Sequence, residues 1–529
     1  MISANRLLAF LALCLATGVH SWGHAAELSP NFLVILADDL GYSDIGCYGS
    51  EIQTPNLDAL AAGGLRYTQF YNTTRCWPTR AALLTGYYAQ QVRRDTVPGI
   101  KSGGLGTRPT WAPLLPMALK PQGYRSYHSG KWHVDSKPIA AGFDHSYWLQ
   151  DCGRNFHPQE HYSDDVALPA VKPGTGYYST TQIAEQAISH LKDHSQNHAS
   201  QPFFQYVAFV APHFPLHAPH EDIAKYKDSY RVGWDVIRER RWEKMKQLGL
   251  VSGELSKVEY DVGPPHDNPK HVADTSPFEV NRPIPWKDLT PEQQEFQATK
   301  MSIHAAMVDR IDQEVGRLLQ QVRKMGQWDN TVVMFLSDNG ASAEILIRDD
   351  GHDPKAPPGS AYTHLCLGPG WSTVSNTPFR RHKTWVHEGG ISTPLIVHSP
   401  QLISTPGELR HQPGHVIDFW PTLTSWAGVK ESPPTPGAPE RPGIAINLAP
   451  DASAVKRDLW WSHEGHRAIR SGDMKLVSDR GKPWELFDLT HDRAEQHDLT
   501  SAHLDKAREL EALWERNWVE FQRQALQPE

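Results

Sequence analysis

The sequence predicts an α/β protein with a large sheet flanked by helices and a small α+β domain at its C-terminal end. Short apolar runs alternate with helical patterns along most of the chain, as they do in α/β folds. The runs consist mostly of β-branched, aromatic and leucine residues, which is typical of strands buried on both faces. A proline-rich break near residues 430–444 precedes a different pattern of short strands and one long helix.

The first part, residues 27–429, is expected to form the large domain. Its strongest strand predictions are Phe32–Ala37, Phe203–Val210, Val332–Leu336 and Leu395–Val397. One helix is expected from Pro55, with Thr54 as its cap, and a long amphipathic helix over Glu292–Met325. Segments 251–290 and 350–380 are rich in Pro, Gly and Asp, and we expect them to be long loops that wall a pocket.

The second part, residues 445–529, follows the predicted linker 430–444. Four short antiparallel strands are expected here, at Asp458–Ser462, Ala468–Arg470, Lys475–Val477 and Trp484–Asp488. A final amphipathic helix is predicted over Leu504–Gln522, with its apolar stripe formed by Leu504, Ala507, Leu510, Trp514 and Phe521.

Composition excludes several classes of protein. The 529 residues are 39% hydrophobic, enough for a large core, and the net charge of −8 without a long basic run argues against a nucleic-acid partner. Residues 1–26 have a charged start, a short apolar stretch and small residues at a cleavage site, as in a secretory signal peptide. No later stretch reaches the roughly 18 apolar residues of a membrane span. We therefore expect an exported protein, periplasmic or secreted.

Four cysteines lie beyond the predicted signal peptide: Cys47, Cys76, Cys152 and Cys366. They are too few for a disulfide-rich scaffold, so a large core must supply the stability. Cys47 and Cys152 are the candidates for one disulfide, although spacing alone does not set the pairing.

Pairs of oxygen-bearing side chains follow two of the predicted strands. Asp38 and Asp39 end the first strand, and Asp338 and Asn339 follow Val332–Leu336. Ligands of α/β sheets bind beyond the carboxyl ends of the strands, so these pairs can converge there. Both members of one pair can reach one ion only if the chain turns at that point. Oxygen donors without Cys or His favour Ca²⁺ or Mg²⁺ over zinc, whereas each pair taken alone is more simply a turn cap.

Cys76 precedes a short helical pattern that we expect to begin at Pro78 and end before Gly86. A helix N-terminus carries partial positive charge and free N–H groups, which suit an anion. Arg80 lies near the first turn and can fork onto carboxylate or sulfate-like oxygens. A buried structural cysteine is the alternative interpretation.

Further cations and imidazoles occur near other predicted strands. Lys131 and His133 are two residues apart, so on a strand both would face one side and could hold an anion and move a proton. His213 follows Phe203–Val210, and Lys383 precedes Leu395–Val397. Each taken alone is more often structural or solvated. His217, His220, His387, Glu388 and His463 are weaker candidates.

The run Cys76-Trp77-Pro78-Thr79-Arg80 resembles the motif of type I sulfatases, which belong to the alkaline phosphatase superfamily. The clusters above also occur in that family's order, and the resemblance extends from about residue 30 to the C-terminus. It implies an alkaline-phosphatase-like mixed sheet and a sulfuric ester hydrolase similar to bacterial arylsulfatases. Thr79 stands where the family usually has Ser.

The resemblance also implies roles for individual residues. A maturation enzyme would convert Cys76 to formylglycine (3-oxoalanine), whose hydrate attacks the sulfur of a sulfated small molecule or glycan. Asp38, Asp39, Asp338 and Asn339, with residue 76, would hold Ca²⁺ or Mg²⁺. Arg80, Lys131 and Lys383 would add positive charge around the sulfate, His213 would protonate the leaving group, and His133 would act as the base for sulfate release.

Two rival functions remain open on sequence alone. A phosphonate or phosphate ester hydrolase of the same superfamily would share the core residues. A non-catalytic binder of sulfated glycans would keep the fold with Cys76 unmodified, and the 18 Trp residues would suit sugar stacking. Hydrolysis of a generic aryl sulfate separates the enzyme from the binder.

Overall fold

The computed structural model describes residues 29–429, 437–450 and 455–527. The predicted signal peptide and part of the predicted linker, residues 430–436, lie outside this range. No helix in the described ranges is both long and apolar enough to cross a membrane.

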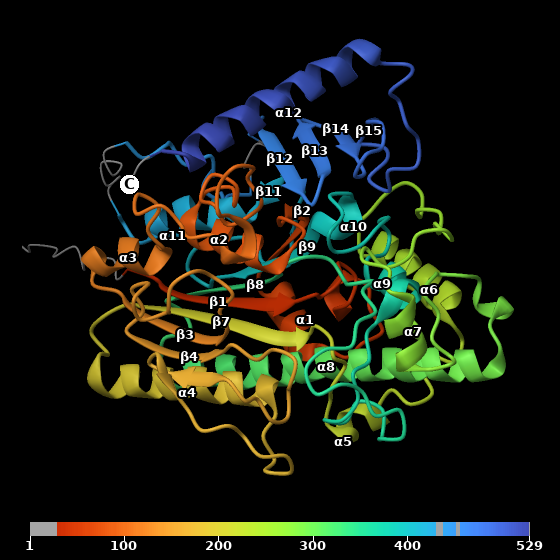
Figure 1. Cartoon of the computed structure of the whole chain (residues 1–529). Coiled ribbons are helices and arrows are strands. Elements are labelled where there is room, and N and C mark those ends of the chain that lie inside the picture. The colour runs from red at the N-terminus through yellow and green to blue at the C-terminus, as the bar shows by residue number, and fades with distance from the viewer. Residues whose placement is uncertain (1–28, 430–436, 451–454, 528–529) are drawn as a thin grey trace, which may run out of the picture.

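A large mixed sheet forms the centre of the molecule (Figure 1). Its eleven strands in the described part are β1 (Asn31–Asp38), β2 (Leu65–Tyr71), β3 (Arg125–Lys131), β4 (His145–Leu149), β5 (His161–Ser163), β6 (Val166–Ala167), β7 (Phe203–Pro212), β8 (Thr331–Ser337), β9 (Ser392–His398), β10 (Leu409–Arg410) and β11 (Gly414–His415). The order is β10-β2-β9-β8-β1-β7-β3-β4-β5-β6, with β11 also paired to β2.

The middle of this sheet is parallel. Strand β1 pairs in parallel with β7 and β8, and β3 pairs in parallel with β7 and β4. Strand β9 runs antiparallel to both β8 and β2, which makes the sheet mixed. The four strands predicted most strongly from the sequence are β1, β7, β8 and β9, and they are consecutive in the sheet, in the order β9-β8-β1-β7.

Helices cover both faces of the sheet. The described α-helices of the large domain are α1 (Pro55–Ala62), α2 (Cys76–Thr85), α3 (Leu115–Leu119), α4 (Ser179–Asn197), α5 (His220–Ala224), α6 (Trp234–Gln247), α7 (Pro269–Thr275), α8 (Pro291–Lys324), α9 (Gly368–Ser375), α10 (Glu388–Ile391) and α11 (Phe419–Trp426). Long helix α8 is capped by Thr290 and lies beside α4 below the sheet, while α2, α3 and α11 lie above it (Figure 1).

Alternation along β1 shows why the sheet is buried on both sides. Leu33, Ile35 and Ala37 belong to the apolar cluster that includes α1, α4 and α8. Phe32, Val34 and Leu36 belong to the opposite cluster with α2, α3 and α11. Successive side chains of a strand point to opposite faces, so a strand covered twice must be apolar throughout.

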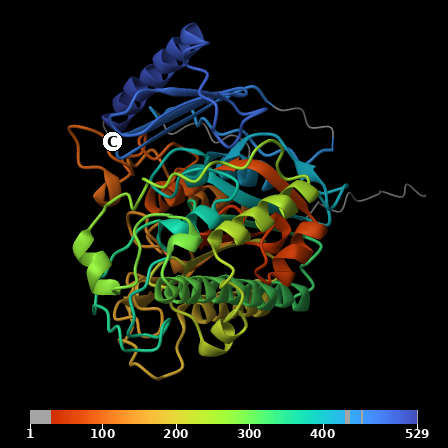
Figure 2. The ribbon, with the colours of Figure 1, turned by 90° about the vertical axis from the view of Figure 1, so that its right-hand side faces the viewer.

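The C-terminal part is a four-stranded antiparallel sheet with one covering helix. Its elements are β12 (Asp458–His463), β13 (His466–Ser471), β14 (Met474–Ser478), β15 (Glu485–Asp488) and α12 (Leu504–Ala525). This unit stacks on the main domain on the side away from α8 (Figure 2). The predicted stripe of α12 is buried except Leu504, which is 52% exposed at the first turn.

Several local predictions need correction. Thr54 occupies the cap position of α1, but its hydroxyl accepts a hydrogen bond from Gly46 N–H and makes no cap bond. Segments 251–290 and 350–380 are not continuous loops, because they contain α7 and α9. Cys47 and Cys152 form no disulfide: Cys47 N–H bonds the Asp58 carboxylate beside α1, whereas Cys152 lines the cavity described below.

Candidate active site

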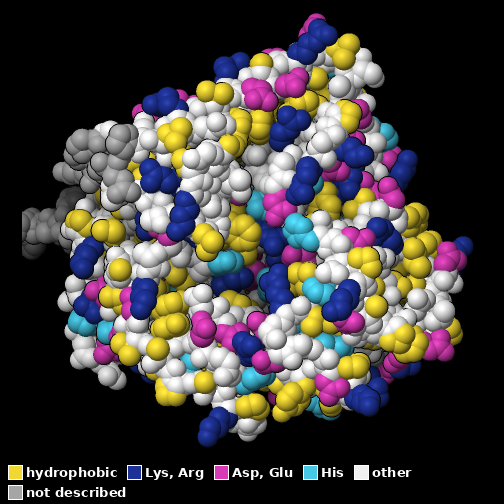
Figure 3. Space-filling model, in the orientation of Figure 1, with side chains coloured by type: hydrophobic (Ala, Val, Ile, Leu, Met, Phe, Trp, Pro, Cys, Tyr) yellow, Lys and Arg dark blue, Asp and Glu magenta, His cyan; other side chains and the backbone are white. Residues whose placement is uncertain are grey.

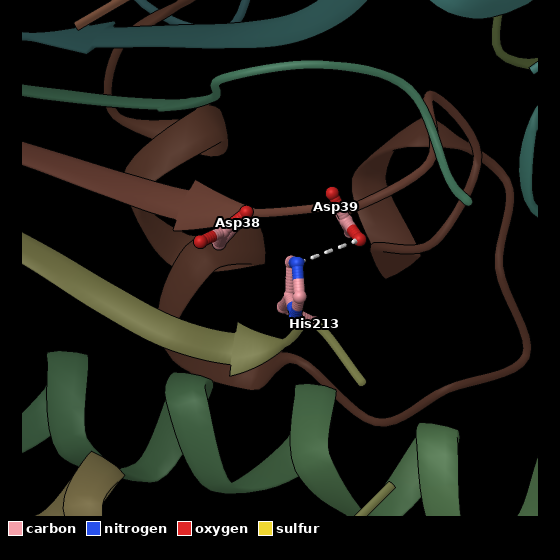
Figure 4. Close-up of side chains that lie close together, drawn as sticks. All are labelled: Asp38, Asp39 and His213. Carbon is pink, nitrogen blue, oxygen red and sulfur yellow. Dashed lines mark ion pairs between the residues drawn. The ribbon is translucent and has the colours of Figure 1, made fainter. Parts of the chain in front are cut away.

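The carboxyl ends of four adjacent parallel strands bring the predicted site together. Asp38 ends β1, Lys131 ends β3, His213 follows β7, and Asp338 and Asn339 follow β8. The chain turns at Asp39, whose φ is 62°, so both carboxylates of the first pair lie near the same strand ends, as the sequence interpretation required. Figure 4 shows Asp38 at the tip of β1 and His213 directed toward Asp39.

Cys76 is the first residue of α2 and is 3% exposed. The helix therefore begins two residues before Pro78, its predicted start, and Gly86 ends it with φ 75°. Burial is the main factor that raises the pKa of the Cys76 thiol. A thiol held in its neutral form is a weak nucleophile, so an unmodified Cys76 is poorly suited to attack.

Three buried cations neutralise the carboxylates. Lys131 Nζ hydrogen-bonds Asp38, and Lys383 Nζ lies 2.8 Å from Asp39 Oδ1. The Arg80 guanidinium donates to Asp338 Oδ2 from Nε at 2.9 Å and from Nη2 at 2.7 Å. Burial opposes ionisation of Asp38, but the charge of Lys131 overcomes it and holds the pKa of Asp38 well below its usual range. Burial and the charge of Asp38 raise the pKa of Asp338 to about 7.

Two buried oxygens in this cluster have no hydrogen-bond partner among the described residues: Asp38 Oδ1 and Asn339 Oδ1. Asn339 Nδ2 is engaged with Asp39 Oδ1 at 2.6 Å, so the amide is oriented with its oxygen free. Ligand atoms of Asp38, Asp39 and His213 all lie within 4.8 Å of one another. A buried oxygen without a hydrogen-bond partner costs stability unless it coordinates a cation. The donor set therefore fits an oxygen-preferring ion such as Ca²⁺ or Mg²⁺.

His213 presents Nε2 to the site. Its Nδ1 lies within hydrogen-bond distance of the Phe214 carbonyl and must donate to it, which leaves Nε2 facing Asp39 Oδ2 at 3.7 Å. Burial and the charges of Lys383 and Lys131 lower the pKa of His213 well below its usual value.

His133 is placed differently from the sequence expectation. Strand β3 ends at Lys131, and His133 follows in a left-handed conformation with φ 54°, so the two side chains do not share a strand face. Both nevertheless line the same cavity. Burial and the charge of Lys131 lower the pKa of His133 well below its usual value, so its imidazole is held in the neutral form.

A cavity of about 530 Å³ contains five of the six predicted catalytic residues: Cys76, Lys131, His133, His213 and Lys383. Figure 3 shows the hollow on one face, with Lys, Arg and His side chains inside and around it. Arg80 is fully buried and is not among the lining residues, because its guanidinium bonds Asp338 and the Lys131 carbonyl. It therefore fixes the carboxylate and the β3 end instead of facing the cavity.

Sequence reasoning missed several residues at this site. Arg75 and Trp77 flank Cys76 and line the cavity, and Arg348 lines its wall. Glu344 pairs with both Lys383, at 3.2 Å, and Arg75, also at 3.2 Å. The positions of Arg75 and Trp77 beside Cys76 were a usable signal, whereas nothing in the local sequence marks Glu344 or Arg348.

The weaker candidates lie outside the cavity lining. His217 Nε2 bonds the Thr363 carbonyl, and His220 starts α5. His387 is fully buried, and Glu388 pairs with Lys475. His463 lies behind Trp77, with its ring edge-on at a centroid distance of 5.8 Å.

The mixed sheet has a charged cavity at the carboxyl ends of its parallel strands, which is the arrangement of an α/β enzyme. The chain belongs to the sulfatase family, whose model matches residues 30–429, and it is a sulfuric ester hydrolase. It is 34% identical over 546 residues to an uncharacterised sulfatase of Schizosaccharomyces pombe, covering 93% of both chains. It is 31% identical over 491 residues to an arylsulfatase of Klebsiella aerogenes, covering 86% of this chain and 98% of that one.

Solved structures share the fold. The crystal structure of Ps i-CgsB with k-i-k-neocarrahexaose matches with a TM-score of 0.65 and 23% identity, covering 94% of each chain. A phosphonate monoester hydrolase from Silicibacter pomeroyi matches with a TM-score of 0.58 and 18% identity, covering 93% of this chain and 95% of that one.

Proposed function

We propose that this sulfatase hydrolyses sulfate monoesters of aryl alcohols or carbohydrates, using a formylglycine made from Cys76 and a bound Ca²⁺. The observation that carries the proposal is the single cavity in which Cys76, two lysines and two neutral histidines meet beside an oxygen-donor cluster. Asp38, Asp39, Asp338 and Asn339 would hold the cation, since two of their oxygens have no other partner among the described residues.

When present, the hydrated aldehyde supplies an oxygen nucleophile with a second hydroxyl, and Ca²⁺ supplies Lewis acidity. The chain's own residues supply position and charge. Lys131 and Lys383 end in the cavity and balance the negative charge of the sulfate. Arg80 does so indirectly, because it holds Asp338 and the Lys131 backbone in place.

Proton transfer is assigned to the two imidazoles. A bound sulfate ester brings negative charge next to His213 Nε2, which favours its protonated form and prepares it to donate to the leaving oxygen. His133 keeps a neutral ring beside Lys131 and Trp77, so it can accept a proton on the Cys76 side of the cavity. The proposal also includes export of the protein to the periplasm or the medium, and conversion of Cys76 by a formylglycine-generating enzyme.

Mass spectrometry of the tryptic peptide Cys76–Arg80 tests the nucleophile. Replacement of CH₂SH by CHO lowers the mass by about 18 Da, and the modified fraction should track the turnover of an aryl sulfate. The Cys76→Ala chain is the matched control. A fully unmodified Cys76 in active enzyme would contradict the mechanism. Preferred turnover of a phenyl phosphonate ester would favour the rival hydrolase, and absence of all turnover would favour the binder.

A further inference from the structure

Arg348 lies at the exposed side of the cavity, on the chain that follows β8. Its guanidinium carbon is 5.2 Å from the centroid of the Phe214 ring. Phe214 also lines the cavity and directly follows His213, the histidine assigned to the leaving group. Arg348 therefore lies over an aromatic ring next to His213, on the side of the cavity where the proposed function places the leaving group.

The other cavity cations already have carboxylate partners. Lys131 pairs with Asp38, Lys383 with Asp39, and Arg75 with Glu344. No carboxylate within the described ranges forms an ion pair with Arg348, and no side-chain hydrogen bond of its guanidinium occurs there either. Its guanidinium N–H groups are therefore available to a ligand.

The two acids that follow Arg348 in sequence lie against residues 153–157. Asp350 accepts two bonds from Arg154, at 2.7 and 2.9 Å, and one contact from His157 at 3.2 Å. The Asp349 carboxylate lies against Gly153, where an added Cβ would fall 1.8 Å from Oδ2. These contacts bring the segment after Arg348 close to residues 153–157, and Arg154 and His157 engage the Asp350 carboxylate there.

We propose that Arg348, stacked on Phe214, binds a second anionic group of the substrate, a carboxylate or a further sulfate on the ring that bears the scissile ester. This inference rests on the proposed function and narrows its substrate class to ring compounds with at least two anionic groups. A guanidinium that lies over an aromatic ring still offers its N–H donors in the planar fork that suits a carboxylate or sulfate.

The test compares substrates of equal shape that differ in charge. Carboxyphenyl sulfate and carbamoylphenyl sulfate form one pair, in meta and para isomers, and the benzenediol bis-sulfates form a third arm that separates sulfate from carboxylate recognition. Arg348→Ala should lower kcat/KM for the anionic member by about 5- to 20-fold, mostly through KM, and for the carboxamide by less than about 2-fold. The difference should shrink as salt is raised.

Two variants serve as controls. Arg348→Lys keeps the charge without the planar fork and should recover part of the loss. Arg523→Ala removes an arginine on α12 that pairs with Glu520 instead, and it should change neither substrate. Equal losses on both members of the pair, or no loss on either, would overturn the inference.

A binding measurement separates this inference from the proposed function. Calorimetry with the Cys76→Ala chain reports affinity for the same esters without turnover. A preference for the anionic ester that disappears in Cys76→Ala/Arg348→Ala supports the subsite even if the chain hydrolyses no sulfate ester. Equal affinity for the charged and uncharged esters in the Cys76→Ala chain overturns the subsite even if hydrolysis is observed.

Discussion

At the residue scale, the hydroxyl of Thr79 connects the nucleophile helix to the cation cluster. Thr79 Oγ1 donates to the Asp338 carbonyl at 2.7 Å and accepts from Thr73 N–H at 3.1 Å. It also lies 2.8 Å from the Thr73 hydroxyl, and a serine hydroxyl can make all three contacts. Thr79 can therefore make the same hydrogen bonds as the Ser that the family usually has at this position.

This contact predicts different outcomes for two substitutions of Thr79. Thr79→Val keeps the shape but leaves the Asp338 carbonyl and Thr73 N–H without a partner, and should lower the free energy of unfolding by about 1–3 kcal/mol. Thr79→Ser should stay within about 0.5 kcal/mol of wild type. Urea unfolding measures both. Equal losses in the two variants would mean that the methyl group, not the hydroxyl, is what matters.

The oxygen-donor cluster predicts a calcium dependence. Asp38 Oδ1 and Asn339 Oδ1 have no partner within the described residues, so Ca²⁺ should raise the melting temperature and a chelator should lower it. Asp39→Asn removes one charged ligand and should weaken Ca²⁺ binding at least about 10-fold. The control is Asp349→Asn, the same change at an exposed acid of the same cavity. Unchanged Ca²⁺ affinity in Asp39→Asn would refute the ligand assignment.

At the element scale, β12 of the C-terminal sheet supports the cavity wall. His463 ends β12, bonds Asp95 Oδ2 at 2.9 Å, and meets the Trp77 ring edge-on. Trp77 in turn lies edge-on to His133 at a centroid distance of 5.6 Å. A residue from the last quarter of the chain thus positions the aromatic ring beside the nucleophile and the proposed base.

Substitution of His463 tests this support. His463→Ala removes both the ring contact and the Asp95 bond, and should lower kcat/KM by about 3- to 10-fold, since such aromatic contacts contribute about 0.5–1.5 kcal/mol. His463→Phe keeps a ring against Trp77 and should retain more activity. Steady-state kinetics over a range of pH is the measurement. Equal activity of the two variants would show that the ring contact is unimportant.

A second link joins α10 to the same sheet through buried charges. Lys475 on β14 lies 3.0 Å from Glu388 Oε1 and 2.7 Å from Glu495 Oε1. Burial and the nearby Glu388 charge raise the pKa of Glu495 to about 7, whereas the cations Lys475 and Arg493 overcome burial and lower that of Glu388 to about 2. Two carboxylates thus share one lysine, and only Glu388 is firmly ionised at neutral pH.

The raised pKa of Glu495 predicts a pH-dependent stability. Its contribution is fully present below the unfolded value near 4.5 and is lost as pH rises through about 7. The lowered pKa of Glu388 contributes to stability with the opposite pH dependence, and this contribution is lost only in acid, as pH falls toward about 2. With Ca²⁺ saturating, wild type should lose about 3 kcal/mol between about pH 5 and pH 8 relative to Glu495→Gln. Urea unfolding at both pH values gives this difference, and parallel pH profiles would contradict it.

At the scale of the whole molecule, the sequence could predict the strands but not their partners. Apolar runs marked β1, β7, β8 and β9, and polar residues after them marked the site, because both are local features. Other features depend on contacts between segments that are distant in sequence. They are the antiparallel pairing of β9, the positive φ of His133 and the ion pair of Arg80 with Asp338. The same reason hid Arg348 and left His463 only a weak candidate, because both residues come near the site only through folding.

The C-terminal sheet and the large domain also share one core. Trp460 of β12, Tyr88 beyond α2 and Phe521 of α12 pack together, with ring centroids 5.0 to 5.9 Å apart. Trp461 Nε1 donates to the Asn72 carbonyl at 2.8 Å, and Gln91 Nε2 to Gln524 Oε1 at 2.7 Å. Tyr88, Trp460 and Phe521 belong to the same apolar cluster as the side chains on one face of β1. The large domain and the C-terminal sheet are separate segments of the sequence, but their side chains pack into one apolar core.

This shared core predicts that the two parts unfold together. Calorimetry of the full chain should show one transition, and a chain that ends at residue 429 should fail to fold, because Tyr88 and the face of α2 above it would be exposed. A protease site inserted between residues 433 and 434 tests whether the covalent link between the two parts is needed. After cleavage, the two fragments should stay associated and active, because their shared core holds them together. Two distinct transitions, or a folded and active truncated chain, would show instead that the large domain is independent of the C-terminal sheet.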